Sequence, residues 1–227
     1  MIKSTAITGH VTMHARDAEI LAVKRMKKDG DLGGDVVERV VGILRDGHVA
    51  VIPVDNVYCI VGTSTGEVRK AAVRHGAGGD EVVTLIGSFK MLNGIAAYNK
   101  SDYDFLNRVW PGEVTVILND LASSNGRKIQ IRYPRNRFLL NVIERLDLPV
   151  YGVTAATGEK ETVYRKKDLV ALFRDAVDLM VIVDELCKKH PQASLIDISG
   201  EALMIVRTGK VSADEIKSLY FLGKADS

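Results

Sequence analysis

Apolar and polar positions alternate along the chain with two different periods. Residues 35–44 repeat valine and leucine at three- and four-residue spacing, which predicts an amphipathic helix. Residues 49–52 and 57–61 are short continuous apolar runs, and such runs predict buried strands. Pro53 lies between the two runs and cannot donate to a strand ladder, so we expect a bend or an edge position there.

The same two periods recur toward the C-terminus. Further helices are predicted at residues 68–75, 101–110, 137–146 and 167–176, and after Ser212. Further strands are predicted at residues 82–86, 114–118, 129–133, 150–153, 179–183, 195–198 and 203–206. Short polar pairs mark helix starts: Asp35 with Glu38, Ser101 with Asp104, and Ser212 with Glu215. Because the last three strands follow one another without helices between them, we expect one α/β domain around a mixed sheet.

The first 34 residues break this pattern. They contain a basic run at residues 24–28 and a glycine-rich stretch at residues 29–34. We therefore interpret residues 1–34 as an N-terminal extension and residues 35–227 as the domain. A basic run of this kind is ordinarily a solvated helical face, and an electrostatic contact with phosphate is the alternative.

Composition narrows the class of protein. The 227 residues are 46% hydrophobic and 26% charged, as in ordinary globular proteins rather than disordered or fibrous ones. The formal net charge of +2 gives no argument for nucleic acid by itself. No apolar stretch approaches the roughly 20 residues that cross a bilayer, and residues 1–10 lack the pattern of a signal peptide. We expect a cytoplasmic protein with no membrane partner.

Cysteine and histidine spacing gives no metal or redox motif. Cys59 and Cys187 are far apart, which predicts two reduced thiols in or near a core. His10 and His14 have the spacing of a metal pair, but no nearby carboxylate or helical pattern supports one. We therefore expect no metal ligands from the chain.

Candidate chemistry comes from weak groupings, because the sequence has no P-loop, nucleophile elbow, HExxH or GxGxxG after a strand. Arg132 and Arg207 each end an apolar strand, where an arginine either makes bidentate contacts with carboxylate or phosphate or extends to solvent. The glycine-rich residues 76–79 favour a plain loop over a phosphate-binding turn, since a strand rather than a helix follows. Trp110, the single tryptophan, is interpreted as a core anchor.

Several short motifs, in order, resemble those of the YrdC-like family. Residues 51–58 resemble its P-T-D-T-V-Y-G turn, residues 110–115 its W-P-G-P-L-T, residues 131–134 its V-R-x-P, residues 194–197 its S-T-V-V-D and residues 207–209 its closing R-x-G. The agreement in order and spacing runs from about residue 35 to residue 220. The chain is identified by this resemblance as a divergent member.

The resemblance implies a fold and a chemistry. The fold would be a single YrdC-like α/β domain, with a twisted mixed and mostly parallel sheet, flanking helices and a concave basic face. Members of the family include threonylcarbamoyl-adenylate synthases, which join L-threonine, bicarbonate and ATP for tRNA modification, and the YciO branch. Such a reaction needs cations around a triphosphate, a clamp for a carboxylate, and Mg²⁺ to offset charge.

The resemblance also implies a set of residues that bind substrate or nucleotide: Asn56, Tyr58, Arg74, Arg132, Thr154, Ser194 and Arg207. We predict that Arg132 and Arg207 converge on one cavity, because they end separate apolar strands and match motifs of the family. No catalytic residue is assigned.

The chain departs from the family pattern at polar positions. The family's K-x-R falls at residues 74–76, where Arg74 is the one cation, and its S-A-N becomes Thr154-Ala155-Ala156. Val54 and Asn56 replace two threonines, and Cys59 replaces a glycine. These losses favour a protein that binds ATP or an adenylate without efficient catalysis. The alternative is an active ATP-dependent carbamoyl-adenylate synthase, a nucleotidyltransferase that uses L-threonine or another amino acid with bicarbonate and Mg²⁺.

The resemblance leaves room for double-stranded RNA as a further partner. Counterion release from phosphates would supply most of the affinity, which should fall steeply with salt. The candidate contacts are Lys24, Arg25, Lys27, Lys28, Arg135, Arg137, Arg165, Lys166 and Lys167.

Overall fold

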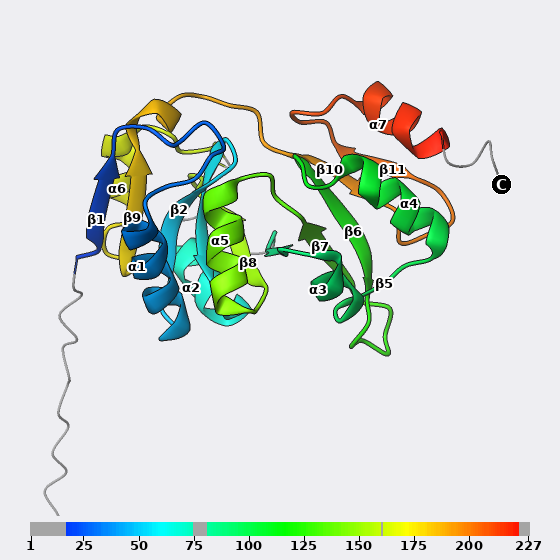
Figure 1. Cartoon of the computed structure of the whole chain (residues 1–227), viewed down its shortest axis with the longest axis horizontal. Helices are drawn as coiled ribbons and strands as arrows, with labels where there is room; N and C mark the ends of the chain where they lie inside the picture. Colours follow the sequence, from blue (N-terminus) through cyan, green and yellow to red (C-terminus); the bar gives the residue numbers. More distant parts are fainter. Residues whose placement is uncertain (1–16, 75–80, 160, 223–227) are drawn as a thin grey trace, which may run out of the picture.

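The computed structural model describes residues 17–74, 81–159 and 161–222, in which helices and strands interleave around one sheet (Figure 1). The strands are β1 (Glu19–Val23), β2 (Ala50–Val54), β3 (Val57–Gly62), β4 (Val83–Leu85), β5 (Ala96–Ala97), β6 (Val114–Asp120), β7 (Lys128–Arg132), β8 (Val150–Thr154), β9 (Leu179–Val183), β10 (Ser194–Asp197) and β11 (Met204–Arg207). The helices are α1 (Gly34–Arg45), α2 (Thr65–Arg74), α3 (Phe89–Asn93), α4 (Lys100–Val109), α5 (Arg137–Leu146), α6 (Lys166–Phe173) and α7 (Ala213–Phe221), with a short 3₁₀ helix at Asp184–Leu186.

The sheet is mixed, as predicted. Its strand order is β1-β9-β2-β3-β8-β4-β7-β6-β10-β11, and β5 pairs with β6. Parallel pairs join β1 to β9, β2 to β9, β4 to β7, and β6 to β10. The other described neighbours are antiparallel and outnumber the parallel pairs. Part of this antiparallel pairing joins strands that follow one another along the chain, such as β2–β3 and β6–β7.

Most predicted elements are confirmed, and α5 and β9 have the predicted bounds. Two predicted helix starts are wrong. The N-cap of α1 is Gly33 without a side-chain bond, so Asp35 and Glu38 form no capping box. The capping box of α4 is Asn99 with Asp102, whereas the box at Ser212 and Glu215 correctly marks α7 through the bond from the Glu215 amide to the serine hydroxyl.

Elements that the sequence did not reveal are β1, α3 and β5. Strand β1 lies within the residues expected to form an extension, and it pairs with β9 along its whole length. Residues 24–28 follow it without helical structure, so the basic run is not a helical face.

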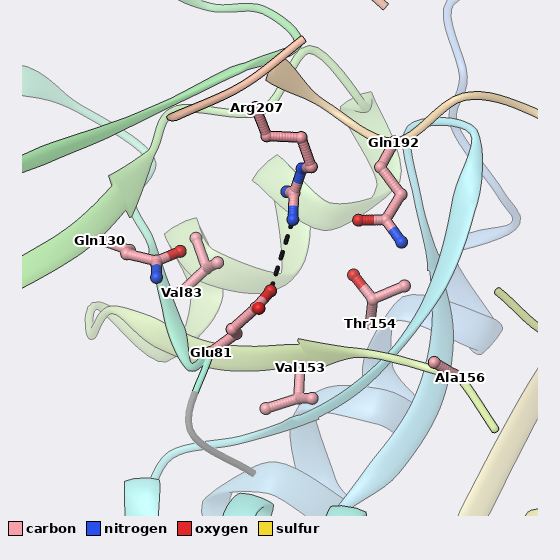
Figure 2. A pocket seen from close by; sticks show the side chains of 8 residues that line it. All are labelled: Glu81, Val83, Gln130, Val153, Thr154, Ala156, Gln192 and Arg207. Carbon is pink, nitrogen blue, oxygen red and sulfur yellow. Dashed lines mark hydrogen bonds and ion pairs between the residues drawn. The ribbon is translucent and has the colours of Figure 1, made fainter. Parts of the chain in front are cut away.

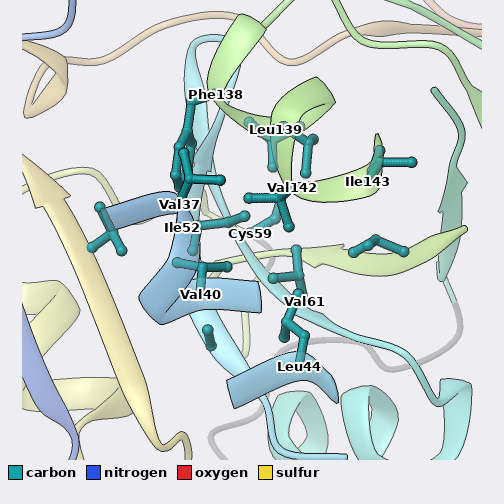
Figure 3. Close-up of a cluster of buried hydrophobic side chains, with 14 of the residues drawn as sticks. Val37, Val40, Leu44, Ile52, Cys59, Val61, Phe138, Leu139, Val142 and Ile143 are labelled. Atoms are coloured by element: carbon teal, nitrogen blue, oxygen red, sulfur yellow. The ribbon is translucent and has the colours of Figure 1, made fainter. Parts of the chain in front are cut away.

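Two helical layers enclose one half of the sheet. Helices α1 and α5 pack on one face, over apolar side chains of β2, β3, β8 and β9, in the cluster of Figure 3. Helices α2 and α6 cover the opposite face of the same strands. In the other half of the sheet, α4 and α7 pack against β6 and β10, where buried Trp110 confirms the predicted core anchor and donates from Nε1 to the Val114 carbonyl at 2.7 Å.

The face of the sheet under α1 and α5 carries apolar side chains, whereas the same face of the neighbouring strands carries polar ones. Directly paired residues of neighbouring strands point to the same face. Leu85 of β4, which packs under α5, pairs with Arg132 of β7, so the α1–α5 face continues across β7, β6, β10 and β11. We call this region the polar half; none of its described residues belongs to the cluster under α1 and α5, which we call the apolar half. Its side chains include Thr115, Lys128, Gln130, Arg132, Asp197 and Arg207.

Pro53 lies inside the sheet rather than at an edge, because β2 runs between β9 and β3. In a two-residue hairpin the residues that flank the turn bond each other, so Val54 bonds to β3 and Pro53 faces β9. Pairing of β2 with β9 stops at Val51. Farther along β9, the Tyr58 hydroxyl replaces the missing strand as the hydrogen-bond partner. It accepts from the Val183 amide at 3.0 Å and donates to the Val183 carbonyl at 2.9 Å.

Candidate functional site

A cavity opens where the apolar half meets the polar half. Arg132 and Arg207 line it together, which confirms that the two arginines converge. Thr154 of β8 and Cys59 of β3 complete its wall, and Thr115 contributes from β6. We call this space the inner cavity.

Arg132 is the buried arginine of the inner cavity. It is 6% exposed, and its Nη2 forms an ion pair with Oδ2 of Asp55, whose side chain is equally hidden. Asp55 adopts a left-handed backbone conformation (φ 53°), which aspartate tolerates better than most residues, in the turn between β2 and β3. Its Oδ1 accepts from the backbone amides of Arg135 and Asn136 at 3.1 and 2.8 Å. The Nε of Arg132 is buried without a hydrogen-bond partner, which is uncommon for a buried polar atom.

Arg207 stands at the mouth of the inner cavity. Its Nη1 lies 3.3 Å from Oε2 of Glu81, and its Nη2 donates to the Ala193 carbonyl at 3.4 Å. The Nε of Arg207 is buried without a partner, as in Arg132. Each arginine therefore has one carboxylate partner and a buried Nε without a partner.

Ser194 and Gly209 hold the chain that carries Arg207. The Ser194 hydroxyl donates to the Val211 carbonyl at 2.5 Å and accepts from the amides of Gly209 and Val211 at 2.9 and 3.2 Å. A Cβ on Gly209 would lie 2.2 Å from the Gln192 carbonyl oxygen, so no larger residue fits without movement. Fully buried Ser194 positions Arg207 from behind, through the backbone.

An outer cavity adjoins the inner one and is shown in Figure 2. It has about 490 Å³ of empty space, counting its opening to solvent, and it shares Val83, Thr154, Gln192 and Arg207 with the inner cavity. Glu81 and Gln130 line it as well. In Figure 2 Arg207 extends from β11 toward Glu81, while Gln192 and Thr154 lie on the other side of the opening. The Gln192 amide donates to Thr162 at 2.8 Å. These groups can bind a polar ligand that also contacts Arg207.

Cys59 is not a nucleophile in this setting. Burial raises the pKa of its thiol to about 12, and the nearby Arg132 and the hydrogen bond from Thr154 offset only part of that effect. The thiol stays protonated at neutral pH and forms part of the cavity floor. Both cysteines are free thiols, as predicted.

The carboxylate of Asp197 is already bound on the polar half. Burial alone would raise the pKa of Asp197. Hydrogen bonds from Ser199 and Lys128 outweigh that effect and lower the pKa below its usual value. The Lys128 ammonium lies 2.9 Å from its Oδ2. Asp197 therefore carries a charge that Lys128 balances.

Three other sequence-predicted residues line neither cavity: Asn56, Tyr58 and Arg74. The Tyr58 ring packs on the opposite face, and Arg74 donates to the Asp175 carbonyl at 2.8 Å. The Asn56 amide donates to Glu113 at 2.7 Å. Residues 75 and 76 of the expected K-x-R position, residues 76–79 and both histidines of the His10–His14 pair lie outside the described residues.

Sequence reasoning missed Glu81, Gln130 and Gln192. Gln130 precedes Arg132 by two positions in β7, so strand alternation places both side chains on one face and could have revealed it. Glu81 likewise precedes Val83 by two positions, and the Val83 side chain lines both cavities, so the same alternation could have indicated Glu81. Gln192 lies outside regular structure, and no local signal marks it.

The basic residues proposed for RNA are all exposed. The loop after β1 contacts the start of α5, where the Phe138 amide donates to the Gly30 carbonyl at 3.1 Å. Acidic partners accompany several of the cations: Lys27 lies 2.9 Å from Asp31, and Lys166 lies 3.8 Å from Asp184.

A further hollow lies near α2. Thr84 and Tyr151 line it from the opposite face of the sheet, Lys128 and Gln130 also contribute, and none of the predicted substrate-binding residues does. Within the described ranges no group of three histidine, cysteine, aspartate or glutamate side chains could hold a metal ion. No helix in the described part of the chain is long and apolar enough to cross a membrane.

The fold and the site define an α/β protein whose mixed sheet carries an arginine-lined cavity. Residues 42–209 match the model of the Sua5/YciO/YrdC family, which is described as "Telomere recombination". The chain belongs to this family. A search among curated proteins found no match.

Solved structures share the fold at low sequence identity. Escherichia coli YciO has a TM-score of 0.74 at 16% identity, over 88% of this chain and 99% of that one. Sua5 of P. abyssi, complexed with L-threonine, has a TM-score of 0.72 at 18% identity, over 88% of this chain and 60% of that one. Full-length HypF, in a phosphate- and nucleotide-bound form, has a TM-score of 0.62 at 12% identity, over 76% of this chain and 29% of that one.

Proposed function

We propose that the joined inner and outer cavities bind ATP or an adenylate, with Arg132 and Arg207 contacting its phosphates. The observation that carries the proposal is that both arginines line one cavity and keep a buried Nε without a partner. Charge-assisted hydrogen bonds from guanidinium groups suit phosphate oxygens well. The binding of nucleotide by the similarly folded HypF and of L-threonine by Sua5 agrees with this choice.

Mg²⁺ would enter with the triphosphate. The described residues offer no cluster of carboxylates, and Asp55 and Asp197 are held by Arg132 and Lys128. Mg²⁺ in such sites commonly keeps its waters and binds through substrate phosphates. It would supply charge neutralisation at the phosphates.

An amino acid is the second ligand that the site could hold. Gln130, Gln192 and Thr154 supply hydrogen-bonding groups next to Arg207. Adenylyl transfer demands more, because donors must already surround the charge that develops at the α-phosphate. Both arginines are partly occupied by Asp55 and Glu81, so we propose binding with little or no synthesis of threonylcarbamoyl-adenylate.

Calorimetry with ATP and Mg²⁺ tests the binding. Arg207→Gln removes one charged donor and should weaken binding roughly 10- to 100-fold. Arg145→Gln, an exposed charge change at the end of α5, is the matched control and should leave affinity unchanged. Absence of ATP binding by the unaltered protein would refute the proposal.

A product assay with L-threonine, bicarbonate, ATP and Mg²⁺ tests the chemistry. We expect no more than trace threonylcarbamoyl-adenylate. Robust product formation would instead support the active synthase. Replacing L-threonine by each other amino acid then decides the substrate.

A second candidate function, binding of double-stranded RNA, has one specific observation in its favour. The loop after β1 is joined to α5 through Gly30, and to the residues after β9 through the Met26 amide, which donates to Glu185 at 2.6 Å. Basic residues from separate segments therefore gather near one end of the sheet. A-form duplexes would be contacted through phosphates and 2′-hydroxyls.

Anisotropy with a labelled RNA duplex tests this function. Binding should fall steeply between low and moderate salt. Lys24→Gln with Lys28→Gln should weaken it, whereas Lys90→Gln with Lys100→Gln, on α3 and α4, should not. Equal losses in the two double variants, or affinity that does not change with salt, would refute it.

A further inference from the structure

The proposed anion site contains a carboxylate at its entrance. Glu81 lies two residues before Val83 of β4, and its side chain reaches across the outer cavity to Arg207 (Figure 2). A phosphate bound to Arg207 would meet this carboxylate at close range. Glu81 therefore affects which ligands can enter.

Two carboxylates contact the site arginines, and they differ in how firmly they are held. The Asp55 side chain is 7% exposed and accepts from Arg132 and from two backbone amides. The Glu81 side chain is 51% exposed and lies outside regular secondary structure. Asp55 is a buried part of the cavity wall, whereas the Glu81 side chain is half exposed to solvent.

The arginine that Glu81 contacts is also the accessible one. The Arg207 side chain is 36% exposed, compared with 7% for Arg132. An incoming anion therefore meets Arg207 first, where Glu81 already occupies Nη1. To bind there, the anion must displace Glu81 or accept its negative charge as a neighbour.

We propose that Glu81 is a specificity-determining residue that competes with anionic ligands for Arg207. This inference rests on the proposed function, since it concerns the same arginine. Glu81 lowers the affinity of the site for polyanions and so reduces the difference in affinity between ligands of high and low negative charge. The effect increases with the charge of the ligand, because repulsion by a neighbouring carboxylate increases with each added negative charge.

The test compares ATP, AMP and adenosine by calorimetry at low salt. Glu81→Gln removes the charge at nearly constant shape and should tighten ATP binding about 3- to 10-fold, since a half-exposed ion pair has a modest effect. AMP should gain less, and adenosine should gain nothing. Glu67→Gln, an exposed glutamate in the first turn of α2, is the matched control and should leave all affinities unchanged.

A double-variant cycle locates the effect. In the Arg207→Gln background, Glu81→Gln should lose most of its benefit, because the group for which Glu81 competes is gone. Thermal unfolding of each variant checks that the fold is retained. An equal gain in both backgrounds would overturn the inference, because it would show a general charge effect.

The outcomes separate the inference from the proposed function. If the unaltered protein binds ATP and Glu81→Gln gives no gain, the inference is overturned and the proposed function stands. If only Glu81→Gln binds ATP, the inference stands and nucleotide binding by the unaltered protein is refuted. If neither binds, both are refuted.

Discussion

The apolar half and the polar half belong to one face of one sheet, yet they have different tasks. Under α1 and α5 the strands present valine, leucine and isoleucine, and Phe138 of α5 is fully buried against them. Across β7 and β11 the same face presents Arg132, Gln130 and Arg207. The difference indicates that this face stabilises the fold at one end and carries, at the other end, the polar groups to which we assign ligand binding. The inner cavity lies at the boundary between them.

The largest effect should come from the apolar half. Phe138→Ala removes a side chain with no exposed surface and should lower the free energy of unfolding by about 3–5 kcal/mol. Phe221→Ala, at a phenylalanine that is 59% exposed, should change it by less than about 0.5 kcal/mol. Urea unfolding measures both. Similar losses for the two variants would contradict the assignment of the core.

The next largest effect on stability should come from the two arginines of the inner cavity, at the boundary between the apolar half and the polar half. Arg132→Gln leaves the Asp55 carboxylate buried without its ion pair and should lower the free energy of unfolding by roughly 3 kcal/mol. Arg207→Gln breaks a half-exposed pair and should lower it by less than about 1 kcal/mol. Adding Asp55→Asn to Arg132→Gln should restore part of the loss. Equal costs for the two arginines would show that they do not differ as described.

A smaller effect is expected behind the polar half. Ser194→Ala removes one donor and one acceptor from the backbone of residues 209–211 and should lower the free energy of unfolding by about 1–3 kcal/mol. It should also weaken ATP binding, because Arg207 loses its support. Ser218→Ala, at an exposed position of α7, is the control for both measurements. Loss of stability with unchanged ATP binding would show that Ser194 does not position Arg207.

The smallest effect concerns Cys59 at the boundary. Its pKa rises from 9.0 to about 12 on folding, so the unfolded chain loses the thiol proton first as pH rises. Stability is therefore complete below about pH 9 and falls between pH 9 and 12, by roughly 1 kcal/mol at pH 10. Urea unfolding at pH 8 and pH 10 should show a smaller fall for Cys59→Ala than for the unaltered protein. Identical falls would contradict the raised pKa.

Much of the fold follows from local pattern. The helix Arg137–Leu146 and the strand Leu179–Val183 have unambiguous periods, and both were predicted with the observed bounds. Strand β1 was missed because its apolar run is short and is followed by the basic run that suggested an extension. The capping box predicted at Asp35 is absent because α1 begins two residues earlier, with Gly33 as its N-cap. The sequence alone does not show which residue takes the N-cap position.

The site was predicted in part. Convergence of Arg132 and Arg207 was expected from their positions at the ends of separate apolar strands and from the family resemblance, and both line the inner cavity. Their carboxylate partners were not foreseen. Glu81 and Asp55 lie 126 and 77 positions from the arginines they contact, and such pairing depends on strand order. No local spacing carries that information.

The two hydrogen bonds between the Tyr58 hydroxyl and the backbone of Val183 limit which residues position 58 can accept. The Tyr58 hydroxyl supplies a donor and an acceptor to Val183 of β9, where pairing with β2 has already ended. Pro53 of β2 has no amide hydrogen, so it cannot supply that donor itself. Phenylalanine would preserve the ring but leave the amide and the carbonyl of Val183 without these partners. A mutational scan scored by folding alone should therefore reject phenylalanine at position 58. Tyrosine at this turn is constrained by sheet architecture before any ligand binds.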